Sequence, residues 1–161
     1  MIALPRKKTK KEVKEILDLL SELHPNAHCE LVHSSPFELL IATILSAECT
    51  DVRVNIVTEE LFKKYNTPED FKNLSIEEIE KEIKTCGLYK SKAKKIKETS
   101  SILVDKYNSE LPDTLEELIT LPGVGRKTAG VVLSNAFGIP AIAVDTHVFR
   151  VSNRIGIVKE K

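Results

Sequence analysis

The sequence predicts an all-α protein on three observations. N-cap signals of the type Ser/Thr-x-x-Glu or Ser/Thr-Pro recur along the 161 residues and are followed by apolar residues at helical spacing. Residues 141–144 could form a buried strand, but no second strand is available to pair with them, so we interpret them as an extended connector. The connections between the expected helices are short, as in helices packed on helices.

Helices are expected at residues 11–24, 36–47, 51–65, 68–74, 76–86, 91–108, 115–120, 126–137 and 146–154. The 36–47 helix is apolar nearly all round, so it is expected at the buried centre. Gly87 is the expected C-terminal stop of the 76–86 helix. The expected N-caps are Ser35, Thr50 or Asp51, Thr67, Ser75, Thr114 and Asp145.

Composition is that of a globular protein, with 42% apolar and 30% charged residues. No apolar run approaches the roughly 18 residues that a membrane helix needs, so no membrane partner is expected. The three cysteines are widely spaced and form no Cys-x-x-Cys pair, which indicates free thiols and a cytoplasmic location. Residues 24–33 contain several side chains of the types that bind zinc, namely His24, His28, Cys29 and His33. They do not form the tight pairs that are typical of zinc ligands, so no metal site is expected.

The net charge is zero, which argues mildly against a nucleic-acid partner. The distribution of charge argues the other way. Residues 6–14 carry six basic residues and one acid, and residues 90–97 carry five lysines and no acid. Such runs are commonly solvated helix faces, but beside a phosphate-binding element they would form a track for a polyanion.

The most informative stretch is Leu-Pro-Gly-Val-Gly-Arg-Lys-Thr-Ala at residues 121–129. Gly123 and Gly125 permit a tight turn and a close approach of the backbone to a ligand. The helix that follows presents unpaired amides at its N-terminus, where a phosphate can bind. The stretch differs from the phosphate-binding loop of nucleotide hydrolases, because Arg126 separates Gly125 from Lys127 and a capped helix, not a strand, precedes it.

Lys127 and Asp145 are the candidate catalytic residues. A lysine is nucleophilic only as the neutral amine, which a helix N-terminus, the adjacent Arg126 and burial would each favour. The helix dipole contributes only about 0.3–1 kcal/mol, so burial would have to supply most of the effect. Asp145 at an N-cap is expected to stay ionised, and it could stabilise positive charge on a sugar or move protons. Taken singly, Lys127 could be a phosphate contact and Asp145 a plain helix cap.

Residues 121–129, followed by Val-Asp-Thr-His-Val-Phe-Arg at 144–150, resemble the helix-hairpin-helix DNA glycosylases, and within them the endonuclease III family. Residues 37–40, 45–47, 50–51 and 87–93 also match, so that the resemblance covers about residues 25–157. It implies a base-excision DNA repair enzyme with two helical lobes flanking a cleft. The implied activity is that of a bifunctional DNA N-glycosylase/AP lyase, which removes oxidised pyrimidines from double-stranded DNA and acts on abasic sites.

The same resemblance implies a mechanism and a set of DNA contacts. The damaged nucleotide is flipped out of the duplex, Lys127 attacks C1′, and a Schiff base leads to β-elimination with help from Asp145. Leu88 corresponds to an apolar wedge in the base stack. The expected DNA-binding residues are Gly123, Val124, Gly125, Arg126, Thr128, Glu48, Leu88, Ser46, Asp51, His147, Lys90 and Lys92.

Two residues depart from the family pattern. Glu48 stands where the family usually has a glutamine, which fills the gap left by the flipped base. An ionised carboxylate cannot donate those hydrogen bonds and would lie among phosphates, so we expect Glu48 to weaken binding to damaged DNA. Gly130 stands where asparagine is frequent, inside a helix, where glycine costs roughly 1 kcal/mol relative to alanine.

By the resemblance, residues 28–140 form a central helical lobe with the helix-hairpin-helix at 114–137, while residues 1–27 and 141–161 form part of a second lobe. Family members usually continue further and bind a [4Fe-4S] cluster through four cysteines. Those ligands are absent, so the C-terminal part of the second lobe is expected to be missing and no cofactor is expected in this chain.

The 11–24 helix is therefore expected to expose Val13, Ile16 and Leu20, in a monomer or against another chain that covers them. Two alternatives to an active enzyme stay open. One is a non-catalytic helix-hairpin-helix DNA-binding module, and the other is an inactive truncated fragment.

Overall fold

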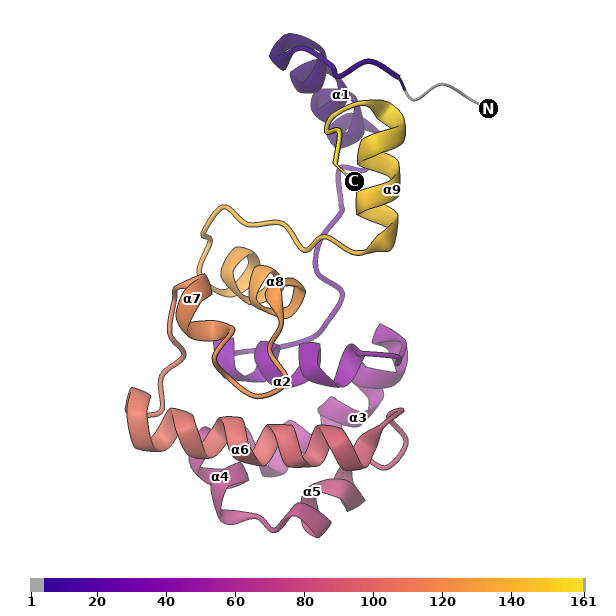
Figure 1. The fold of residues 1–161 in the computed structure, drawn as a ribbon. Coiled ribbons are helices and arrows are strands. Elements are labelled where there is room, and N and C mark those ends of the chain that lie inside the picture. The colour runs from indigo at the N-terminus through magenta and orange to yellow at the C-terminus, as the bar shows by residue number, and fades with distance from the viewer. Residues whose placement is uncertain (1–4, 161) are drawn as a thin grey trace. The chain divides into compact units, whose positions relative to one another are not determined.

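The computed structural model describes residues 5–160, and these contain helices and no strand (Figure 1). The all-α prediction is confirmed, and residues 141–144 are an irregular connector as expected. The helices are α1 (Lys10–Leu23), α2 (Pro36–Ser46), α3 (Asp51–Lys64), α4 (Pro68–Asn73), α5 (Ile76–Glu82), α6 (Tyr89–Tyr107), α7 (Leu115–Leu118), α8 (Arg126–Ala136) and α9 (Thr146–Ile155).

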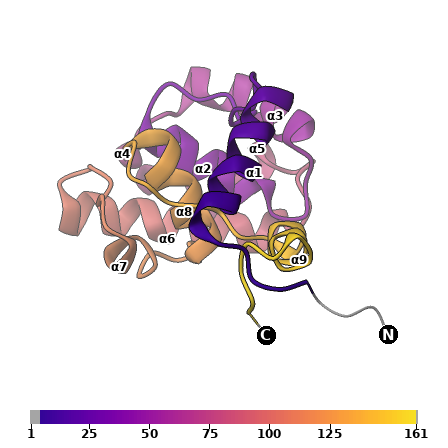
Figure 2. The same ribbon diagram turned by 90° about the horizontal axis from the view of Figure 1, so that it is seen from above.

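The chain divides into two compact units, which are described separately. Residues 29–143 form a central unit with α2 to α8, and residues 1–28 with 144–161 form a terminal unit with α1 and α9. In the central unit α2 contacts α8 on one side and α6 on the other (Figures 1 and 2). Helices α4 and α5 pack against α6.

The core of the central unit is built around α2, as its sequence predicts. Leu39, Leu40, Ile41 and Leu45 have no exposed surface. Burying a large apolar side chain is worth about 1.5–3 kcal/mol, so this helix alone accounts for much of the hydrophobic stabilisation. The helices that surround α2 are held by their caps and by the apolar residues on their inner faces.

The expected caps are confirmed by hydrogen bonds to backbone amides. Ser35, Thr50, Thr67, Ser75 and Thr114 each accept one from the residue three positions on. The cap at Thr114 is not a full capping box. In a capping box the acid three residues on accepts from the N-cap backbone amide, whereas here the Glu117 carboxylate accepts from the Thr114 hydroxyl at 2.8 Å.

The prediction for Gly87 is wrong. Helix α5 ends at Glu82 with Ile83 as its C-cap, and Gly87 does not have a positive φ. A Cβ at Gly87 would lie 3.0 Å from the Glu48 carbonyl oxygen, so glycine leaves room here for a close approach of two backbone segments.

The terminal unit has amphipathic helices without a buried side chain. Its ends meet where the Lys8 amide donates to the Gly156 carbonyl at 2.7 Å. Of the three side chains expected to be exposed on α1, Leu20 is exposed and the other two, Val13 and Ile16, are half-buried. No helix in residues 5–160 is both long and apolar enough to cross a membrane.

Candidate nucleic-acid interface

The hairpin between α7 and α8 takes the conformation that its sequence predicts. Gly123 has a φ of +80°, a left-handed value that glycine adopts without strain. Gly125 is the N-cap of α8, and because glycine has no side chain, no side-chain hydrogen bond caps this helix. The first amides of α8 therefore lack an intrahelical acceptor and a capping side chain, which leaves them available to an anion.

Val124 is one of the predicted DNA contacts, but its side chain is buried. The Val124 side chain is 6% exposed, and its amide donates to the Leu121 carbonyl at 3.1 Å. Val124 thus anchors the hairpin in the core, and neither its side chain nor its amide is free for DNA. The predicted contacts on either side differ in exposure, since Gly123, Gly125 and Arg126 are exposed while Thr128 is half-buried.

Helix α6 supports the hairpin from below. The hydroxyl of Thr99, which has no exposed surface, donates to the Pro122 carbonyl at 2.7 Å. A Cβ at Gly123 would lie 3.1 Å from the Cβ of Lys95, so the lysine stem packs directly under the turn. These contacts fix the hairpin on a rigid helix, as a precise binding site requires.

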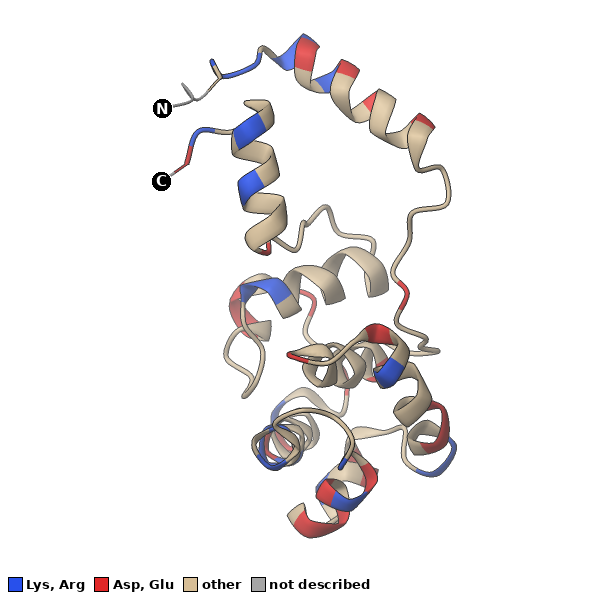
Figure 3. Cartoon of the chain, turned by 90° about the vertical axis from the view of Figure 1, so that its right-hand side faces the viewer, with Lys and Arg blue, Asp and Glu red and all other residues tan. Residues whose placement is uncertain are grey.

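Lys127 and Asp145 lie in different units. Lys127 follows the first residue of α8, and its side chain is exposed, so the folded chain does not supply the burial that a neutral amine was expected to need. Asp145 is the N-cap of α9, as predicted, and its carboxylate accepts from the Val148 amide at 2.7 Å. Helix α9 itself carries Arg150 and Arg154 and no acid (Figure 3).

Glu48 and Leu88, the two residues expected to insert into the DNA at the flipped base, share an uncommon backbone conformation. Glu48 has a φ of 53° and Leu88 a φ of 57°, both in the left-handed region that non-glycine residues rarely adopt. Both side chains are exposed, with Leu88 at 60%. The Gly87 backbone lies close to the Glu48 carbonyl. The loop that carries Glu48 and the loop that carries Leu88, which are far apart in the sequence, are therefore neighbours in the central unit.

Lys92, which the resemblance places among the DNA-binding residues, has a buried side chain whose ammonium is bound within the protein. Lys92 is 3% exposed, and its Nζ donates to the carbonyls of Leu45 at 2.8 Å and Ala47 at 2.6 Å. Burial lowers its pKa, against the opposing effect of the nearby Cys86, Cys49 and Glu48. Sequence reasoning missed this role because spacing alone cannot tell an inward-facing lysine from a solvated one.

A second lysine of the 90–97 run also faces inward. Lys97 Nζ donates to the carbonyls of Lys72, at 2.8 Å, and Leu74. Lys90, Lys94 and Lys95 are exposed, so the basic track expected on α6 is narrower than the sequence suggests. Lys90 keeps its predicted position at the surface.

The other predicted contacts have ordinary local partners. Ser46 is half-buried, and its hydroxyl donates to the Thr43 carbonyl at 2.8 Å. Asp51 is exposed in the first turn of α3, where a carboxylate is favoured by the helix dipole. In the terminal unit, exposed His147 pairs through Nδ1 with the Arg150 guanidinium at 3.1 Å.

The thiols do not fit an iron–sulfur cluster, which needs four of them. Cys29, Cys49 and Cys86 are all free, and Cys49 lies beside Cys86. Burial, followed by interactions with Cys49, raises the pKa of Cys86 to about 11, which favours the protonated thiol over a metal-binding thiolate. Residues 5–160 contain no group of three or more His, Cys, Asp or Glu side chains that could hold a metal ion.

The structure explains why a glycine, Gly130, stands inside α8, which the sequence alone did not. A Cβ at this position would lie 3.1 Å from the Ile142 carbonyl oxygen and 3.5 Å from the Ala143 Cα. The connector after α8 therefore runs directly against the helix, and glycine gives it room.

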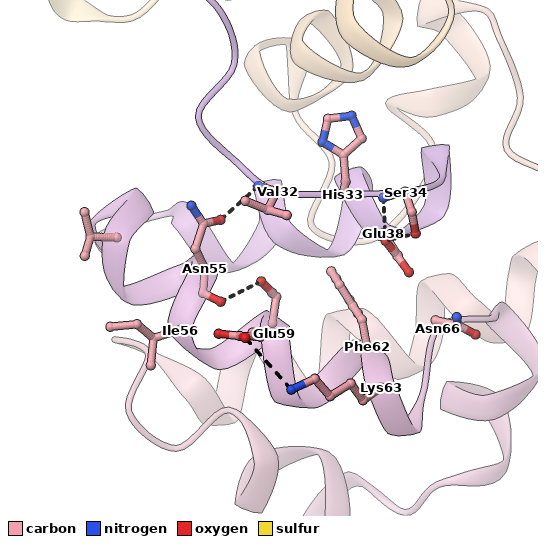
Figure 4. Close-up of a pocket in the computed structure, with 12 residues that line it drawn as sticks. Val32, His33, Ser34, Glu38, Asn55, Ile56, Glu59, Phe62, Lys63 and Asn66 are labelled. Carbon is pink, nitrogen blue, oxygen red and sulfur yellow. Dashed lines mark hydrogen bonds and ion pairs between the residues drawn. The ribbon is translucent and has the colours of Figure 1, made fainter.

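A cavity of about 710 Å³ lies elsewhere in the central unit, between α3 and the loop before α2 (Figure 4). None of the predicted site residues lines it. Its polar groups mainly hold this loop, since Glu38 accepts from the Ser34 amide at 2.6 Å and Asn55 accepts from the Val32 amide at 2.9 Å. The cavity is therefore part of how the loop is fixed on α2 and α3.

This fold and hairpin define a class of DNA repair protein: residues 41–161 match the HhH-GPD superfamily of base excision DNA repair proteins, and the chain belongs to that family. Endonuclease III of Bacillus subtilis (strain 168) is 54% identical over 151 residues, which cover 94% of this chain and 69% of that protein. Endonuclease III of Escherichia coli (strain K12) is 54% identical over 140 residues, or 87% of this chain and 66% of that one.

Solved structures agree with this assignment. A structure described as a non-covalent endonuclease III–DNA complex superposes with a TM-score of 0.88 at 55% identity, covering 94% of this chain and 71% of that one. A trapped endonuclease III–DNA covalent intermediate gives the same values. A thermostable thymine-DNA glycosylase is more distant, at 29% identity and a TM-score of 0.83, with 91% of this chain and 69% of that one covered.

Proposed function

We propose that this protein is a DNA N-glycosylase with AP-lyase activity, which removes oxidised pyrimidines from double-stranded DNA and nicks the resulting abasic site. The observation that carries the proposal is the hairpin at residues 121–129, which sets Lys127 in the first turn of α8 beside unpaired amides. The similarity to a DNA complex trapped as a covalent intermediate supports a lysine that bonds to its substrate.

In the proposed reaction, the Lys127 amine attacks C1′ of the flipped nucleotide as the bond to the base breaks, and the base leaves with its electron pair and takes up a proton. The sugar ring opens to a protonated Schiff base. Loss of a C2′ proton then expels the 3′ phosphate by β-elimination, and water releases Lys127. Asp145, as an ionised carboxylate at the start of α9, stabilises the positive charge on the sugar and assists the proton transfers.

Lys127 is exposed in the folded chain. In the proposed reaction it is therefore the bound nucleotide that excludes water from the Lys127 amine. DNA is held by the amides of α8, by Arg126 and Lys90, and by the exposed Glu48 and Leu88 at the opened base pair. We place the protein in the cytoplasm, where its free thiols stay reduced, as a monomer or with α1 covered by another chain.

Borohydride reduction tests the proposal, because it converts a Schiff base to a stable amine. With duplex DNA that contains one abasic site, we expect a covalent protein–DNA adduct, and we expect Lys127→Ala to abolish it. Arg126→Ala is the matched control, since it removes the adjacent exposed cation and should leave some adduct formation.

Two other outcomes would replace the proposal. Binding of abasic duplex without any adduct would assign a non-catalytic DNA-binding module. A broad, non-cooperative thermal transition without binding would assign an inactive fragment.

A further inference from the structure

Helix α6 touches all three elements that the proposed function places at the DNA. Leu88 is its N-cap, Lys92 reaches the loop that carries Glu48, and Thr99 holds the hairpin. Lys92 and Thr99 are seven residues apart, two helical turns, so they lie on the same face of α6. The helix therefore sets the spacing between the insertion loops and the phosphate-binding turn.

The contact made by Lys92 is unusual for a lysine. Its ammonium is buried and is bound by the carbonyls of Leu45 and Ala47, at the C-terminal end of α2. Carbonyls at this end of a helix have no intrahelical donor and carry the negative end of the dipole, so a cation stabilises them. Hydrogen bonds from a charged donor are worth about twice those between neutral groups, and Lys92 makes two of them.

The loop that Lys92 holds is backbone-strained at Glu48. The left-handed conformation of Glu48 is one that non-glycine residues rarely adopt, and it persists only where the surroundings enforce it. Lys92 fixes the chain one residue before Glu48, at the Ala47 carbonyl, and the Gly87 backbone passes so close that a Cβ there would lie 3.0 Å from the Glu48 carbonyl oxygen. These two contacts constrain the backbone that carries Glu48 next to the loop that carries Leu88.

We propose that Lys92 is a positioning residue for DNA insertion. By fixing the end of α2 against the start of α6, it holds Glu48 and Leu88 as one unit that enters the opened base pair. The inference rests on the proposed function, and it assigns Lys92 no contact with DNA. Its consequence is specific to double-stranded substrate, because single-stranded DNA has neither an opposite base nor a stack to fill.

The test compares Lys92→Met with Lys97→Met by borohydride trapping on abasic DNA in duplex and single-stranded form. Both variants remove a lysine of α6 that binds carbonyls at the end of another helix, but the Lys97 partners, Lys72 and Leu74, lie away from the insertion loops. For Lys92→Met we expect the ratio of duplex to single-strand trapping rates to fall roughly tenfold, within the range that misplacement of a binding group produces. For Lys97→Met we expect the wild-type ratio.

A wild-type ratio in Lys92→Met, or an equal fall in Lys97→Met, would overturn the positioning role. No trapping by the wild-type protein on either substrate would instead refute the proposed function. If Lys92→Met does not fold, Gly87→Ala perturbs the same junction without removing a charge, because its Cβ would press on the Glu48 carbonyl. It should lower the same ratio, and an unchanged ratio in a folded Gly87→Ala protein would count against the inference.

Discussion

The Thr99 hydroxyl donates a 2.7 Å hydrogen bond to the Pro122 carbonyl, and Thr99 has no exposed surface. This bond joins α6 to the turn that presents the first amides of α8. Pro122 precedes the left-handed Gly123, so its carbonyl orientation and the shape of the turn are linked. A buried hydroxyl thus supports the element on which phosphate binding depends.

Replacing Thr99 with valine keeps the side-chain shape and removes the donor. We expect unfolding free energy to fall by about 1–3 kcal/mol, because the Pro122 carbonyl is left without its partner, and we expect weaker binding to undamaged duplex. Urea unfolding and fluorescence anisotropy measure the two effects. Ser101→Ala is the control, since Ser101 bonds only within α6, to the Lys97 carbonyl, and should change neither quantity appreciably. Equal effects in both variants would contradict a role for Thr99 at the hairpin.

Glu48 is exposed on a strained loop, and its carboxylate would enter a region dense in phosphates. We expect Glu48→Gln to raise affinity for duplex with an abasic site severalfold, because the amide is neutral and can donate hydrogen bonds. Competition binding against undamaged duplex measures the gain.

The matched control is Glu110→Gln, which removes the same charge from an exposed position after α6. It should raise affinity for damaged and undamaged duplex alike, and only slightly. Unchanged or poorer binding of Glu48→Gln to the abasic duplex would refute the interpretation of Glu48 as an unfavourable substitution.

Cys86 is buried, and burial raises its pKa to about 11 from a usual value of 9.0. We expect alkylation by iodoacetamide at pH 8 to be much slower at Cys86 than at half-buried Cys29, because only the thiolate reacts. Mass spectrometry of peptides after timed quenching measures both rates. Comparable rates at the two thiols would contradict this assignment.

The same raised pKa predicts how stability depends on pH. A group whose folded-state pKa exceeds its unfolded value contributes stability that is present below the unfolded pKa and lost as pH rises through the folded one. The contribution from Cys86 should therefore be complete below pH 9.0 and disappear toward pH 11. A Cys86→Ala protein should lack that part of the alkaline decline in urea unfolding.

Local chemistry in the sequence determined much of this fold. A hydroxyl followed by an acid or proline predicted the caps of α2 to α5, because each cap is made within four residues. The hairpin was predictable for the same reason, since glycine spacing controls the turn directly. These features need no knowledge of the rest of the chain.

What could not be predicted depends on contacts between distant segments. Gly87 and Gly130 make room for backbone that comes from elsewhere in the central unit, at Glu48 and Ile142. Lys92 shares a lysine-rich run with exposed neighbours, and only the packing of α6 on α2 shows that it faces inward. The exposure of Lys127 likewise follows from tertiary structure, which the helical period does not specify.

The central claim is that the Lys127 amine forms the covalent bond to the sugar. Peptide mapping of the borohydride-reduced adduct, formed on duplex with one abasic site, tests it most directly. We expect the modified peptide to contain Lys127 and the modification to lie on its Nζ. A modification on any other amine, or no modified peptide in a folded protein that binds the duplex, would contradict the claim.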